Sequence, residues 1–92
     1  MNIQHHSDAK GGRFFYSENE KELATMTYVW AGEGKIIIDH TEVDPSLKGK
    51  GVGNELVAAA VEKARAEGFK ILPLCPFAKA VIDKNESYQD VL

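Results

Sequence analysis

The stretch VDPSLKGKGVGNELVAAAVEKA, from Val43 to Ala64, decides how the chain is interpreted. Its first part is rich in glycine and lysine, and its second part repeats apolar residues at helical spacing. A loop that leads from a strand into a helix directs unpaired backbone N–H groups to one place, where they attract phosphate together with the helix dipole. Alternating glycines allow the positive φ angles of such a nest of amides, and lysines add positive charge. The residues with these properties are Lys48, Gly49, Lys50, Gly51 and Gly53.

Two common nucleotide-binding motifs do not fit this loop. The P-loop pattern G-x-x-x-x-G-K-[ST] is absent, and the spacing G-x-G-x-G differs from the dinucleotide pattern G-x-G-x-x-G. Short glycine motifs also occur in turns that bind nothing, so a turn without a ligand stays an alternative.

Length and composition restrict the class of protein. The chain has 92 residues, which predicts one domain over residues 1–92. A net charge of −3 argues against a general nucleic-acid binder. Cys75 is the single cysteine, so an internal disulfide is excluded, and no apolar run approaches the roughly 20 residues that span a bilayer. We therefore expect a cytoplasmic monomer with no nucleic-acid or membrane partner.

The first half of the chain is predicted to be an antiparallel meander. Strand patterns cover residues 13–18, 22–32 and 35–43, with turns at 19–21 and 31–35. The continuous run Ile36–Ile38 predicts a central strand covered on both faces. Gly11 and Gly12 are predicted to form a turn, and His5 and His6 to lie in a solvated segment.

The second half is predicted to be a βαβ unit. Apolar spacing predicts a helix from Val52, ended by a left-handed cap at Gly68. A fourth strand is predicted from Phe69, stopped by Pro76, and a short helix from Ala78 to about Lys84. A strand–helix–strand connection places the third and fourth strands side by side and parallel. The fold class is α/β, or α+β in some schemes.

The loop and its surroundings resemble the acetyl-CoA pyrophosphate loop of the GNAT superfamily of N-acetyltransferases. The residues that match are Val43, Pro45, Lys48, Gly49, Lys50, Gly51, Val52 and Gly53, with Lys48 where the family has Arg or Gln. The segments HTEV, PLCPF and SYQDVL resemble a short stand-alone subgroup of the family that lacks the usual substrate-covering helices.

The resemblance implies a minimal GNAT fold, in which the two parallel strands separate at their C-terminal ends. The pantetheine arm of acetyl-CoA would pair with the first of them, and backbone amides of the loop would bind the pyrophosphate; no metal is expected. The implied binding residues are Glu42, Val43, Lys48, Gly49, Lys50, Gly51, Val52, Gly53 and Asn54.

The implied position of the acetyl group is between His40, Glu42 and the fourth strand, close to Cys75. Neutral His40 suits a general base near pH 7, and Glu42 could orient it or act alone. Cys75 could be a nucleophile, with its pKa lowered by His40, or an acid. The alternatives are a small buried Cys75 and a His40 with only a structural role.

The resemblance implies an acetyl-CoA-dependent N-acetyltransferase. Without covering helices, the acceptor side would be open to a protruding amine, such as an amine of a peptide or protein, whose identity the sequence leaves undetermined. The alternatives are a CoA-binding or acyl-CoA-binding module without turnover and a structural protein.

Overall fold

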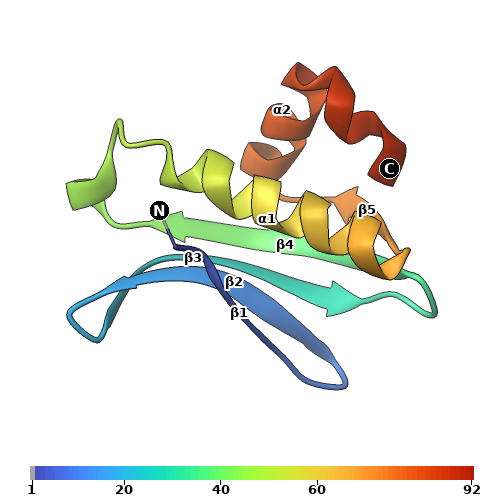
Figure 1. Ribbon diagram of the computed structural model, residues 1–92, viewed down its shortest axis with the longest axis horizontal. Coiled ribbons are helices and arrows are strands. Elements are labelled where there is room, and N and C mark those ends of the chain that lie inside the picture. Colours follow the sequence, from blue (N-terminus) through green and yellow to red (C-terminus); the bar gives the residue numbers. More distant parts are fainter. Residues whose placement is uncertain (1) are drawn as a thin grey trace.

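Within residues 2–92, which the computed structural model describes, one mixed sheet has the strand order β1-β2-β3-β4-β5 (Figure 1). The elements are β1 (Gln4–Ser7), β2 (Gly11–Glu18), β3 (Lys21–Trp30), β4 (Lys35–Val43), the 3₁₀ turn η1 (Pro45–Leu47), α1 (Val52–Glu67), β5 (Lys70–Pro73), α2 (Pro76–Lys84) and the 3₁₀ segment η2 (Glu86–Val91).

The predicted meander and crossover are confirmed. Strands β2, β3 and β4 pair antiparallel, and β5 pairs parallel to β4 with Ile36 opposite Ile71. Asn19 and Glu20 turn from β2 into β3 with positive φ angles of 51° and 66°, a geometry that suits a tight hairpin. Helix α1 ends at a left-handed Gly68 (φ 76°), as predicted.

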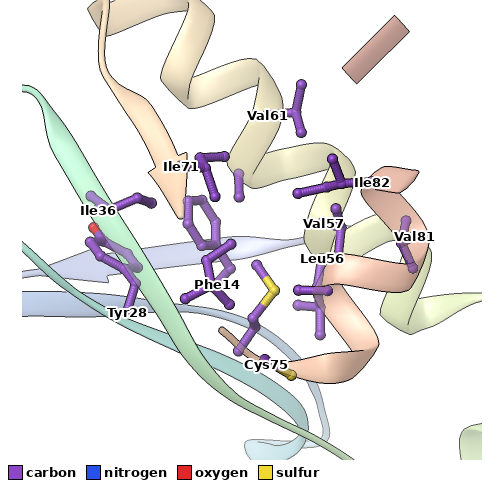
Figure 2. Close-up of a cluster of buried hydrophobic side chains, with 14 of the residues drawn as sticks. Phe14, Tyr28, Ile36, Leu56, Val57, Val61, Ile71, Cys75, Val81 and Ile82 are labelled. Carbon is purple, nitrogen blue, oxygen red and sulfur yellow. The ribbon is translucent and has the colours of Figure 1, made fainter. Parts of the chain in front are cut away.

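Both helices lie on one face of the sheet and cover the core (Figure 1). Met26 of β3, Ile38 of β4 and Leu56 of α1 are fully buried, and Figure 2 shows Leu56 among the neighbouring core residues. The prediction that β4 is covered on both faces is wrong. On the helix-free face, Val29 and Leu72 remain 41% and 37% exposed.

No helix among residues 2–92 is long and apolar enough to cross a membrane.

The N-terminal segment forms an edge strand that the sequence analysis did not predict. Gly11 and Gly12 open β2 and pair with β3 instead of forming a turn. Glycine is needed at position 11 because a Cβ there would lie 2.2 Å from the Tyr28 carbonyl oxygen. Strand β1 pairs with β2, and His5 Nε2 lies 2.6 Å from Tyr28 Oη while its ring stacks on Phe14. The prediction that His5 is solvated is therefore wrong, whereas His6 is exposed.

Helix α2 begins two residues earlier than predicted, at Pro76 instead of Ala78, and β5 ends at Pro73. Proline is favoured at the first helical position because its φ is already helical and that position needs no N–H donor. Cys75 precedes it as the N-cap residue with an extended backbone. The cysteine thus lies where the strand ends and the helix begins.

Burial lowers the pKa of His5, and the nearby Lys63 and His6 lower it further, whereas Glu67 opposes them. The folded chain then takes up a proton at His5 less readily than the unfolded chain does. The stability contributed by His5 is complete above the ordinary histidine pKa, about 6.5, and declines as the pH falls below it.

We expect the wild-type free energy of unfolding to fall more steeply than that of His5→Gln between about pH 7.5 and pH 5. Urea denaturation over this pH range measures the difference. His6→Gln is the matched control, because it changes the neighbouring, exposed histidine and should keep the wild-type pH dependence. Equal pH dependence in wild type and His5→Gln would contradict the expectation.

Candidate active site

Strands β4 and β5 separate at Ile38. The carbonyl oxygen of Ile38 accepts hydrogen bonds from the N–H groups of both Leu74 and Cys75, each at 3.0 Å. Strand β5 ends there, whereas β4 continues to Val43. Within residues 2–92, residues 39–43 of β4 have no neighbouring strand on this side, so their backbone groups form an open edge.

A β-bulge at Asp39 changes which side chains of β4 face the helices. Thr27 pairs with His40, but the next residue of β3, Tyr28, pairs with Ile38. The extra residue reverses the alternation of faces. Thr41 consequently lies on the same face as Ile38, toward the helices.

Thr41 contacts the thiol of Cys75 on this face. The Cys75 thiol donates to Thr41 Oγ1 at 3.3 Å, and Figure 2 shows Cys75 at the border of the buried cluster. Burial raises the pKa of Cys75, but hydrogen bonding to the Thr41 hydroxyl and the backbone N–H groups of Ala78, Phe77 and Thr41 together lower it below the ordinary value. Two of these N–H groups belong to the first turn of α2, which favours a thiolate.

His40 and Glu42 lie on the opposite, helix-free face. Their side chains are 63% and 76% exposed, and His40 Nε2 lies 3.0 Å from Glu42 Oε1. The prediction that His40 lowers the pKa of Cys75 is wrong, because the bulge turns the imidazole away from the thiol and Thr41 takes its place. The structure brings His40 together with Glu42 and keeps both apart from the thiol.

The glycine-rich loop presents several unpaired amides. Gly49 and Gly51 have φ angles of 81° and 73°, in the region that favours glycine. The amides of Lys48 and Lys50 donate to the carbonyls of Pro45 and Leu47, so these two members of the predicted set are occupied. From Lys48 to Asn54, the remaining amides, those of Gly49, Gly51, Val52, Gly53 and Asn54, have no backbone acceptor within residues 2–92.

A cleft of about 430 Å³ lies over these amides. Val43 at the end of β4 and Phe77 at the start of α2 form its apolar walls, and Lys48 also lines it. A Cβ on Gly53 would lie 2.3 Å from Cζ of Phe77. Glycine at this position therefore lets the aromatic ring approach the start of α1.

Thr41 and Phe77 are the site residues that the sequence analysis did not identify. An alternation of faces along β4 without a bulge predicts that Thr41 lies on the face away from the helices. Only the bulge at Asp39 places it on the face of the thiol. Phe77 lies two residues after the cysteine in PLCPF. A predicted helix start at Pro76 would have placed Phe77 in the first turn of α2, beside the cysteine. Within residues 2–92, no three His, Cys, Asp or Glu side chains are grouped to hold a metal ion.

We expect Thr41→Val to raise the pKa of Cys75, because valine keeps the shape of threonine but removes the hydroxyl that stabilises the thiolate. Thr41→Ser should keep the wild-type value. The ultraviolet absorbance of the thiolate during a pH titration measures this pKa without ambiguity, since Cys75 is the single cysteine. An unchanged titration in Thr41→Val would contradict the role of the hydroxyl.

Known proteins with similar sequence or structure identify the family. A family model described as GCN5-related N-acetyl-transferase matches residues 13–91. A GCN5-like protein from Staphylococcus aureus is 40% identical, with a TM-score of 0.77 over 98% of this chain and 85% of that one.

Two enzymes below 25% identity share the fold. The ribosomal-protein-S18-alanine N-acetyltransferase of Escherichia coli (16% identity, TM-score 0.69) and the IAA acetyltransferase of Bacillus cereus (20%, 0.64) align over 85% and 82% of this chain, which spans 53% of each. A comparison with curated proteins gave no match. The family match and the 40% identical relative show that the chain belongs to the GCN5-related N-acetyltransferase (GNAT) superfamily of acyltransferases.

Proposed function

We propose that the protein transfers the acetyl group of acetyl-CoA to an amine acceptor. The observation that carries this proposal is a row of unpaired amides at the start of α1, which opens on a cleft beside the open edge of β4. The thiol of Cys75 lies at the other end of this edge, where β4 and β5 separate.

The loop would hold the diphosphate of coenzyme A. Five amides without a backbone acceptor belong to residues that line this cleft, and the dipole of the 16-residue helix α1 adds positive potential. Lys48 lines the same cleft. These local groups would offset the net charge of −3, which otherwise repels an anion.

The open edge of β4 would bind the pantetheine arm. Asp44 donates its N–H to Leu23 on β3, and successive residues of a strand turn their backbone groups to opposite edges. The alternation indicates that Thr41 and Val43 present their backbone to the open edge, whereas Glu42 is turned to β3. We therefore assign this role to Thr41 and Val43 in place of Glu42 and Val43.

Transfer by direct attack needs a base for the amine and an acid for the leaving thiolate. His40, held by Glu42 at 3.0 Å, would take the proton of an amine that arrives from the helix-free face. As the new C–N bond forms and the C–S bond breaks, Cys75 would give its S–H proton to the coenzyme A thiolate.

The second route uses Cys75 as the nucleophile. Its thiolate would attack the thioester and release coenzyme A thiol, and the amine would then take the acetyl group from the cysteine sulfur. The lowered pKa of Cys75 suits this route as well as the acid role.

The helix-free face suits an acceptor amine on a peptide or protein. Val29, Ile37 and Leu72 form a row of paired residues across three strands, and the outer two are well exposed. An uncovered face admits a protruding side chain or chain terminus more readily than it encloses a small metabolite.

Addition of coenzyme A should shift the NMR signals of the Gly49, Gly51 and Gly53 amides, because these donors would bind the diphosphate. The amides of Gly32 and Gly34 are matched controls, since both glycines also have positive φ but lie in a turn that precedes a strand. Shifts confined to the control turn, or no shifts, would contradict the proposed site.

Cys75→Ala should lower the rate of acetyl transfer to a panel of peptide amines by about 100-fold or more, while leaving the coenzyme A-induced shifts in place. Mass spectrometry after mixing with acetyl-CoA alone separates the two routes. One acetyl group on Cys75 indicates the nucleophile, and an unmodified but essential Cys75 indicates the acid. A wild-type rate in Cys75→Ala would exclude both roles.

A further inference from the structure

The helix-free face of the sheet (Figure 1) changes from apolar to acidic along β3 and β4. Its apolar row consists of the paired residues Val29, Ile37 and Leu72. The next row on this face contains Thr27, which pairs with His40. Because two residues of an antiparallel strand span about 7 Å, the apolar row lies about that far from the row of His40. One side of the proposed base is therefore apolar.

The other side of His40 is acidic. In the following row, Thr25 pairs with Glu42. Both residues line a cleft of about 460 Å³ at this end of the two strands, together with the carboxylates of Glu22 and Asp44. The residues that line this cleft include no lysine or arginine. The cleft therefore suits a cationic group of a bound molecule.

Asp44 is the carboxylate of this acidic cleft that is most available to a cation. Glu22 is already paired with Arg13 at 2.7 Å, whereas Asp44 forms no salt bridge within residues 2–92. Asp44 Oδ1 accepts the backbone N–H of Ser46 at 2.9 Å. Hydrogen bonds from Ser46 and the charge of Lys21 lower the pKa of Asp44, so its carboxylate is ionised near neutral pH.

The acidic cleft suits a second cation of the acceptor better than it suits the reacting amine. Carboxylates favour the protonated form of a nearby amine, and a protonated amine has no electron pair with which to attack a thioester. The reacting amine would instead lie at His40. Side chains two residues apart in an extended peptide point to the same side and are about 7 Å apart. This spacing matches the succession of apolar row, His40 and acidic cleft.

We propose that the acceptor is a lysine in an extended peptide, with an apolar side chain two residues to one side of it and a cationic side chain two residues to the other. The apolar side chain would lie on the row of Val29, Ile37 and Leu72, and the cation would lie in the cleft beside Asp44. This inference rests on the proposed function, because it takes the reacting amine to lie beside His40.

Rates of acetyl transfer to synthetic peptides with blocked termini test the preference. The peptides carry one lysine, with leucine and arginine two residues away on either side, in both orders, and glycine elsewhere. Arginine is not itself an acceptor, because its guanidinium stays protonated. For one order, kcat/KM should fall about three- to tenfold when glutamine replaces arginine. It should fall about threefold or more when glycine replaces leucine. Added salt should weaken the effect of arginine.

Asp44→Asn should lower the ratio of kcat/KM between the arginine and glutamine peptides about twofold or more, because asparagine retains the cap on Ser46 but removes the charge. Asp8→Asn is the matched control. Asp8 also accepts backbone N–H groups in a turn, but it lies at the other end of the sheet, so this variant should keep the wild-type ratio. A wild-type ratio in Asp44→Asn would overturn the role of the acidic cleft.

Two other results would overturn the peptide inference but leave the proposed function in place. The first is an equal kcat/KM for all the peptides. The second is a higher kcat/KM for a free polyamine, such as spermidine, than for every peptide, since a polyamine would use the acidic cleft without the apolar row. If wild type acetylates neither the peptides nor the polyamine, both proposals are overturned.

Discussion

The shared hydrogen-bond acceptor at Ile38 determines the arrangement of the site. Because its carbonyl binds the amides of both Leu74 and Cys75, β5 cannot continue beside β4, and Pro76 starts α2 at once. The separation leaves the last residues of β4 with an open edge and places Cys75 directly before the first turn of α2. A parallel pair of the same strands in full register would offer neither feature.

Local patterns predicted most of the framework. The period of two in β3 and the helical spacing of α1 both reflect burial on one face, which the chain expresses residue by residue. The loop was also predictable, because positive φ at Gly49 and Gly51 and a left-handed cap at Gly68 are conformations that favour glycine. The position of each of these features depends mainly on its own segment.

Features that depend on distant contacts were not predictable. Strand β1 is polar in sequence, and its place in the sheet depends on His5 meeting Tyr28, 23 residues later. The bulge at Asp39 has no glycine to indicate it, and the Asp39 carboxylate is held across the strands by the Thr27 hydroxyl at 2.6 Å. Without the bulge, the period of two would place His40 beside Ile38, on the face of the thiol.

The bulge also helps to distinguish direct transfer of the acetyl group from transfer through an acetylated Cys75. His40 and Cys75 lie on opposite faces of β4, so an acetyl group at its open edge would lie between them. An amine arriving from the helix-free face could then lose its proton to His40 while Cys75 protonates the leaving thiolate from the other side. An acetyl group carried on Cys75, which is only 6% exposed, would have to be reached from the helix side. The geometry therefore favours Cys75 as the acid in a direct transfer.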